Sequence, residues 1–238
     1  MKGYLINTKP LTVHQHMAVD EILKDEVYNN KERQIILRFF NWQPKDSVTF
    51  GYAQFFKEVL EKVSAKNIPY ENIVRRPTGG GIVFHLDDIT FSLIFPHENA
   101  VEKPQDIYDK LHNKIKLHFR GENFNTQGEV SKENYAPSLK NQAGQCFENP
   151  VSNDILDADG KKVLGGAIRR FDNIILYQGS FQTSNARTNK QIKQNIIKGV
   201  EDFFGIVLKS KDIEPATLEQ AKQLSQTKYE TEGWIKKF

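Results

Sequence analysis

Apolar residues recur along this chain with two different spacings. Apolar side chains three and four residues apart predict amphipathic helices, and these occupy residues 13–27, 54–67, 104–120, 188–205 and 217–238. Almost wholly apolar runs predict buried strands, which occupy residues 33–42, 47–52, 173–181 and a long stretch that ends at Phe95. The helix at 188–205 begins at a threonine and closes with a glycine, which are typical start and stop signals.

The clearest hairpin signal lies between residues 152 and 182. Asp159 and Gly160 form a favoured two-residue turn, and strand-like runs flank them on both sides. Because most of the expected strands are neighbours in sequence, we expect them to pair largely antiparallel. The sequence therefore predicts an α+β protein, in which helices flank a mixed, largely antiparallel sheet.

Composition places the chain among ordinary globular proteins. It has 238 residues, of which 38% are hydrophobic and 26% are charged. The formal net charge is +3, and the basic residues are interspersed with acidic ones. This pattern excludes a dedicated nucleic-acid binder and weakly favours acidic partners.

The sequence also predicts where the protein works. It has one cysteine, Cys146, so no internal disulfide is possible. The first residues lack the apolar run of a signal peptide, and no window reaches the roughly 18 apolar residues of a membrane span. We expect a cytoplasmic protein that does not bind a membrane.

Three consecutive glycines follow two arginines in the segment RRPTGGG, residues 75–81. Backbone N–H groups without neighbouring Cβ atoms can form a concave site for an anion or a carbonyl group. Arg75 and Arg76 would add directed donors. The segment is not a phosphate-binding P-loop, because it lacks the Gly-Lys-Ser/Thr ending. The alternative is a tight turn before a strand.

Lys162 precedes a pair of glycines, Gly165 and Gly166, which Ala167 follows. A lysine beside small residues can reach a buried substrate, and its ammonium can polarise a carbonyl group. The alternative is a solvated hairpin lysine, which the adjacent Lys161 makes plausible.

Cys146 and five histidines are the remaining candidates for a chemical role. Cys146 lies in a polar stretch, where it is either an activated nucleophile or a small buried residue. His85 is a general base or a hydrogen-bonded core histidine. The pairs His14/His16 and His112/His118 are predicted on helix surfaces, and no metal site is expected, because the chain has neither an HExxH nor a CxxC motif.

Taken together, these segments resemble the lipoate–protein ligase and octanoyltransferase superfamily, which also includes the biotin ligases. The stretch RRPTGGGIVFH is similar to the family's R-R-x-x-G-G-G-x-V-x-H signature, and KVLGGAIRR is similar to K-x-x-G-x-A-x-R. ILYQGSF stands where the family has H-G-[ST], and Gln178 is a departure from that motif. The resemblance implies the biotin/lipoate ligase fold for a single catalytic domain over residues 1–238, without a C-terminal accessory domain.

The resemblance also implies covalent attachment of an octanoyl or lipoyl group to lipoyl domains. Lys162 matches the family lysine that contacts the acyl carbonyl or the acyl-adenylate. The implied substrate-binding residues are Arg75, Arg76, Thr78, Gly79, Gly80, Gly81, His85, Gly165, Gly166, Ala167 and Arg169. The implied acceptors are lipoyl domains such as the glycine cleavage H protein or the acyltransferase subunit of 2-oxoacid dehydrogenases.

Two branches of the superfamily fit, and Cys146 separates them. CFENPVSNDIL is similar to the C-F-x-x-P-S-x-x-E-L stretch of cysteine-dependent octanoyltransferases, although Val151 replaces a serine. On this reading, Cys146 accepts the acyl group from acyl carrier protein, and no cofactor is needed. The alternative is a ligase that uses ATP and magnesium to make lipoyl-AMP, for which Arg169 matches a position near the adenylate. A non-catalytic binding module is a third possibility, against which Lys162 argues.

Overall fold

The computed structural model describes residues 1–119, 154–157, 159 and 161–238. Its strands are β1 (Lys2–Leu11), β2 (Gln34–Trp42), β3 (Ser47–Phe50), β4 (Ile73–Arg75), β5 (Val83–His85), β6 (Ile89–Pro96), β7 (Ile155–Leu156), β8 (Lys162–Phe171), β9 (Ile174–Phe181) and β10 (Lys209–Ser210). Its α-helices are α1 (Val13–Asn29), α2 (Phe56–Ser64), α3 (Pro104–Leu117), α4 (Lys190–Phe204), α5 (Pro215–Leu224) and α6 (Glu232–Ile235). Short helical turns occupy Tyr70–Asn72, Ala186–Thr188 and Ser225–Tyr229.

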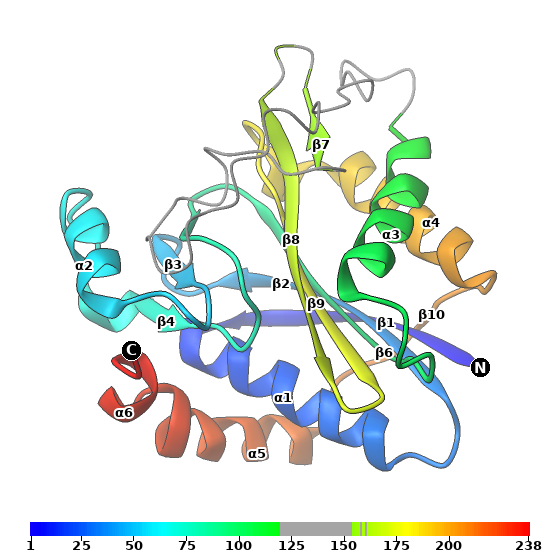
Figure 1. The fold of residues 1–238 in the computed structure, drawn as a ribbon, viewed down its shortest axis with the longest axis horizontal. Helices are drawn as coiled ribbons and strands as arrows, with labels where there is room; N and C mark the ends of the chain where they lie inside the picture. Colours follow the sequence, from blue (N-terminus) through cyan, green and yellow to red (C-terminus); the bar gives the residue numbers. More distant parts are fainter. Residues whose placement is uncertain (120–153, 158, 160) are drawn as a thin grey trace.

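A large sheet forms the centre of the fold, and a small sheet lies beside it (Figure 1). Within the described residues, the strand order is β10-β1-β2-β6-β9-β8-β7 in the large sheet and β4-β3-β5 in the small one. Four neighbouring pairs of the large sheet, from β2–β6 to β7–β8, are antiparallel, whereas β1 runs parallel to β2 and to β10. The predicted mixed, largely antiparallel sheet is confirmed.

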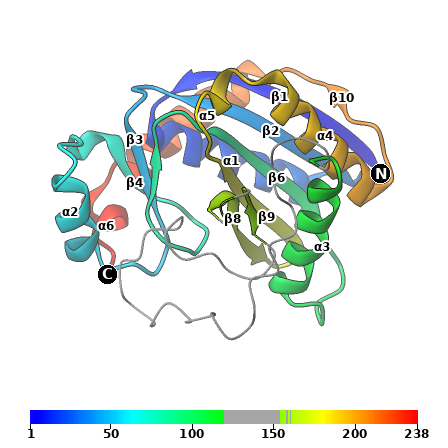
Figure 2. The ribbon, with the colours of Figure 1, turned by 90° about the horizontal axis from the view of Figure 1, so that it is seen from above.

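Helices cover both faces of the large sheet (Figures 1 and 2). Helices α3 and α4 pack on one face, and helix α1 packs on the other with α5 beside it. Strand β2 shows why the two cores differ. Its residues Ile35, Leu37 and Phe39 belong to the first core, and the alternating Ile36 and Phe40 belong to the second.

The small sheet has its own core, and it carries the glycine-rich segment. Val48, Phe50 and Ile73 of the sheet pack against Val59 of α2 and Ile235 of α6. Strand β4 ends at Arg75, and the segment that follows reaches the large sheet, where the Thr78 hydroxyl donates to Gln178 of β9. This arrangement brings the two sequence motifs together.

Several predicted elements have different limits in the structure. Strand β1 was not predicted, because the polar residues in KGYLINTKPL interrupt its apolar positions. Helix α4 is capped by the side chain of Asn189, not by Thr188, but it does close at Gly205 in a left-handed conformation. The predicted final helix is divided by the π-helical turn Ser225–Tyr229. Strands β7 and β8 pair antiparallel, as the predicted hairpin requires. Gly160, which belongs to the predicted turn, lies outside the described residues.

Candidate active site

A pocket lies on the α1 face of the large sheet, between this sheet and the small one. Across strands β2, β6, β9 and β8, the residues Phe40, Thr90, Ser180 and Gly165 lie opposite one another, and all four line it. Its empty space, including that open to solvent, is about 390 Å³. The apolar and small lining residues are Met17, Phe40, Trp42, Val83, Gly165, Gly166, Ala167 and Gly179, and the polar ones are Thr49, Arg76, His85, Thr90, Gln178 and Ser180.

The structure brings residues of both predicted motifs into this pocket. Arg76 and His85 come from the glycine-rich segment and the strand after it. Gly165, Gly166 and Ala167 come from β8. The small residues on β8 leave the pocket open above this part of the sheet.

Arg76 holds the glycine-rich segment in its turn. Its Nε and Nη2 donate to the carbonyl oxygen of Gly79 at 3.1 and 2.6 Å, and its Nη2 donates to that of Gly81 at 2.9 Å. Gly80 between them has φ +87°, and a Cβ there would lie 2.8 Å from Arg76 Nη2. Gly80 is therefore required by the turn itself.

Close approach also explains a glycine outside the motif. The carbonyl oxygen of Gly80 lies 1.9 Å from the position that a Cβ on Gly51 would take. The N–H of Tyr52 donates to the carbonyl oxygen of Thr78 at 2.8 Å, which fixes the two segments together. Gly51 is therefore needed because these two segments of the chain pack closely together.

Arg75 does not line the pocket. Its guanidinium is fully buried and donates to the backbone carbonyls of Tyr52 and Gln54 on one side and of Trp234 and Ile235 on the other. Burial lowers the pKa of Arg75 from 12.5 to about 10. The structure therefore places this predicted substrate-binding residue as an anchor for α6.

Thr78 acts on the pocket through Gln178. The Thr78 hydroxyl donates to Gln178 Oε1 at 2.7 Å, and Gln178 Nε2 donates to Asp20 Oδ2 at 2.7 Å. These two bonds fix the orientation of the amide, because its oxygen faces a hydroxyl donor and its nitrogen faces a carboxylate. Gln178 thereby joins the glycine-rich segment to helix α1.

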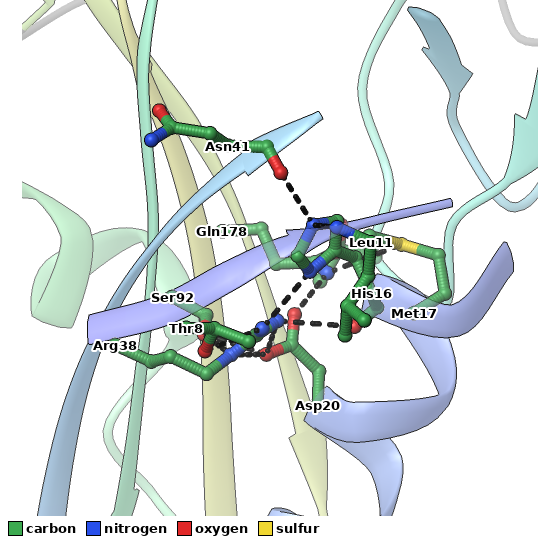
Figure 3. A network of polar contacts seen from close by, with 10 residues as sticks. Thr8, Leu11, His16, Met17, Asp20, Arg38, Asn41, Ser92 and Gln178 are labelled. Carbon is green, nitrogen blue, oxygen red and sulfur yellow. Dashed lines mark hydrogen bonds and ion pairs between the residues drawn. The ribbon is translucent and has the colours of Figure 1, made fainter. Parts of the chain in front are cut away.

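Asp20 belongs to a buried network that the sequence analysis did not predict (Figure 3). Asp20 Oδ1 accepts from Arg38 Nη2 at 2.6 Å and from the Ser92 hydroxyl at 2.6 Å. Arg38 and Asp20 are both 0% exposed. Arg38 Nη1 lies 3.2 Å from His16 Nδ1, which must accept because arginine only donates. His16 Nε2 then carries the proton and donates to the Asn41 carbonyl at 2.8 Å.

The prediction of helix-surface histidines is wrong for three of the four. His14, His16 and His112 are buried. Burial and the nearby Arg38 lower the pKa of His16 well below its ordinary value, so this imidazole is neutral. Hydrogen bonds to residues on other elements compensate for the burial of His16 and His112. The spacing of residues within a helix does not reveal such partners, so the sequence did not predict this burial.

His85 faces the pocket with both ring nitrogens engaged. Its Nδ1 lies 2.7 Å from Asp88 Oδ2, and its Nε2 lies 3.0 Å from the Thr49 hydroxyl. Burial alone would raise the pKa of Asp88, but His85, with Ser180 and Thr90, outweighs burial and lowers it. His85 is thus a hydrogen-bonded histidine in the pocket wall.

Lys162 is buried and lies beside the pocket. Its side chain is 3% exposed, and its Nζ lies 2.9 Å from Asp154 Oδ2. The pairing of β7 with β8 shifts by one residue here, and such an irregularity re-aims side chains. A Cβ on Gly165 would lie 2.0 Å from Lys162 Cε and 2.5 Å from Nζ. The solvated-lysine alternative is therefore wrong for Lys162, whereas Lys161 is exposed.

One further predicted residue, Arg169, is not among the residues that line the pocket. Arg169 donates to the Pro77 carbonyl at 2.7 Å and lies over the rings of Tyr52 and Phe171, so it supports the start of the glycine-rich segment. Cys146 lies outside the described residues. Within the described ranges, no cluster of three potential metal ligands is found, and no helix is long and apolar enough to cross a membrane.

Replacing Gly165 by alanine should displace Lys162. The added methyl would overlap its Cε at 2.0 Å, so the ammonium must leave its position beside the pocket. We expect a loss of at least about tenfold in turnover, because positioned donors act only at short range. Steady-state kinetics of the acyl transfer proposed below measure this. Gly233→Ala, where nothing lies within 4 Å of the added methyl, is the control. Equal turnover of the two variants would contradict the placement.

Comparison with solved structures defines the fold. The fold matches lipoate-protein ligase A bound with ATP, with a TM-score of 0.74 over 99% of each chain and 21% identity. It also matches a lipoate protein ligase from Thermoplasma acidophilum, with a TM-score of 0.72 over 100% of this chain and 98% of that one, and 18% identity. The chain has the lipoate ligase fold.

Comparison of sequences gives the family. Residues 12–217 match the model of the lipoyl protein ligase A/B catalytic domain, and the chain belongs to this family. Octanoyltransferase LipM of Staphylococcus epidermidis is 25% identical over 97% of this chain and 96% of its own length. Octanoyltransferase LipM of Bacillus subtilis is 32% identical over 69% of this chain and 59% of its own length.

Proposed function

We propose that this protein transfers an octanoyl group from acyl carrier protein to the target lysine of lipoyl domains. One observation carries the proposal: a largely apolar pocket has the buried ammonium of Lys162 beside its wall at Gly165. A short acyl chain that ends in a reactive carbonyl needs both features. The similarity to octanoyltransferases LipM over nearly the whole chain supports this choice.

The proposed reaction consists of two acyl transfers through Cys146. The Cys146 thiolate attacks the thioester carbonyl of the donor, and a new C–S bond forms. The C–S bond of the donor breaks, and the carrier thiolate leaves and takes up the proton that the Cys146 thiol released. The amine of the target lysine then attacks the Cys146 thioester. An amide forms, the C–S bond breaks, and the amine proton returns to Cys146. In each step Lys162 stabilises the oxyanion.

The same proposal covers partners, cofactors and location. Residues 1–238 act as one catalytic domain in the cytoplasm, and the mildly basic charge suits acidic carrier proteins and lipoyl domains. The donor thioester is already activated, so neither ATP nor magnesium is required. The alternative is an ATP-dependent ligase, for which Arg169 beside the glycine-rich segment would serve near an adenylate.

The intact mass of an apo lipoyl domain tests the proposal. One reaction contains octanoyl-carrier protein without ATP, and the other contains octanoate or lipoate with ATP and magnesium. Each is repeated with Cys146→Ala. We expect the octanoyl mass increment in the first reaction and its loss in the variant, because the thioester intermediate requires the thiol. Modification only with ATP, unaffected by Cys146→Ala, would replace the transferase by the ligase.

A further inference from the structure

Lys162 is one member of a buried cluster that also includes Asp154 and Tyr108. The two oxygens of the Asp154 carboxylate have different partners. Oδ2 lies 2.9 Å from Lys162 Nζ, and Oδ1 accepts a hydrogen bond from the Tyr108 hydroxyl at 2.6 Å. Tyr108 and Asp154 are 4% and 2% exposed. All three polar groups are thus removed from water.

The cluster is continuous with the backbone that walls the pocket. The N–H of Gly166 donates to the Tyr108 hydroxyl oxygen at 3.3 Å, and Gly166 lines the pocket. The Tyr108 ring stacks on His112 of the same helix, with the ring centroids 3.9 Å apart. The hydroxyl therefore has a fixed place, from which it orients one oxygen of Asp154 while the other faces the ammonium.

We propose that Asp154 and Tyr108 are positioning residues, which hold Lys162 beside Gly165 as a charged ammonium. This inference rests on the proposed function, and it goes further by assigning roles to Asp154, which stands at the acidic position of the octanoyltransferase stretch, and to Tyr108, which lies outside the motifs. Asp154 acts through its charge, and Tyr108 acts by fixing the carboxylate. Neither needs to touch the substrate.

The physical requirement comes from burial. A buried lysine tends to lose its proton, whereas a carboxylate at short range favours the ammonium. Besides Lys162 and Asp154, the ionisable side chains at this place in the described part of the chain are Tyr108 and His112 of α3 and Tyr177 of β9. None of these carries a negative charge at neutral pH. Within that part of the chain, Asp154 thus supplies the negative charge that keeps Lys162 protonated.

The charge of Asp154 is tested by Asp154→Asn, which keeps the shape and removes the charge. Without this negative charge, the alkaline limb of the plot of kcat against pH should move to lower pH by about one unit or more, while KM changes little. A structural defect alone would lower activity without moving this limb. An unchanged limb in a folded, active variant would overturn the proposal.

A second measurement does not depend on turnover. The titration of Lys162 is followed by NMR of protein labelled with ¹³C at lysine Cε, and the signal is assigned by its absence in Lys162→Gln. We expect its midpoint about one unit or more lower in Asp154→Asn than in the unaltered protein. Equal midpoints would overturn the inference even if the protein proved to be a ligase. If the unaltered protein failed to transfer octanoyl while the midpoint moved, only the proposed reaction would fall.

Tyr108→Phe tests whether Tyr108 orients the Asp154 carboxylate. It also tests the proposal if Asp154→Asn does not fold. We expect kcat to fall about tenfold without a shift of the pH limb, because the carboxylate keeps its charge and loses its orientation. Tyr229→Phe is the matched control, since Tyr229 is also buried and its hydroxyl donates to Glu21 at the same 2.6 Å. Equal kcat in the two variants would overturn the role of Tyr108.

Discussion

Replacing Lys162 by glutamine is expected to lower kcat for octanoyl transfer about 100- to 1,000-fold. Each acyl transfer passes through a tetrahedral oxyanion, and removing one preorganised donor to such an oxyanion typically has this effect. The ammonium is buried beside the pocket wall, where a charge acts far more strongly than in water. Single-turnover kinetics with octanoyl-carrier protein and an apo lipoyl domain measure the loss.

A second variant separates chemistry from folding. Lys162→Gln leaves the Asp154 carboxylate without its cation in a buried place, which destabilises the protein. The double variant Lys162→Gln/Asp154→Asn removes both charges, so we expect it to recover stability in urea denaturation but not activity. If the double variant recovered transfer as well, the loss in the single variant would reflect folding, and Lys162 would have no catalytic role.

Local patterns were sufficient to predict the class of fold, and the resemblance to the superfamily named several residues that line the pocket. Hairpin signals and apolar runs depend on neighbours in sequence, so they account for the antiparallel pairs β7–β8 and β8–β9. The antiparallel pairs β2–β6 and β6–β9 join strands that are far apart in sequence. The small residues Gly165 to Ala167 line the pocket. Strand β1 was missed because its parallel partner β2 lies beyond helix α1 in the chain, and its apolar positions are interrupted.

Long-range partners account for what the sequence could not predict. Two adjacent arginines look alike in sequence, yet Arg75 turns to the carbonyls of α6, and Arg76 turns to those of the glycine-rich segment. Asp154 and Tyr108 are 46 positions apart, and no motif joins them. The same holds for Asp20 and Arg38, whose pairing requires helix α1 to lie on the face of β2.

Asp20→Ala is expected to destabilise the protein by about 3–5 kcal/mol, because it leaves the buried guanidinium of Arg38 without a carboxylate. Gln178 would lose its acceptor at the same time, so the pocket should loosen with the fold. Urea denaturation of the purified protein gives the free energy of unfolding. Asp25→Ala in the same helix is the matched control, since its carboxylate is half exposed and its ion pair with Lys24 contributes about 0–1 kcal/mol.

A double-mutant cycle shows whether the loss comes from the unpaired charge. Asp20→Leu/Arg38→Met removes both charges and retains apolar volume, and such replacements are often neutral or stabilising. We therefore expect the double variant to be more stable than Asp20→Leu alone, and the cycle with Asp20→Leu and Arg38→Met to give a coupling energy of about 1–3 kcal/mol between the two positions. Additive losses would mean that the two charges contribute independently, through His16, Ser92 and Gln178 rather than through each other.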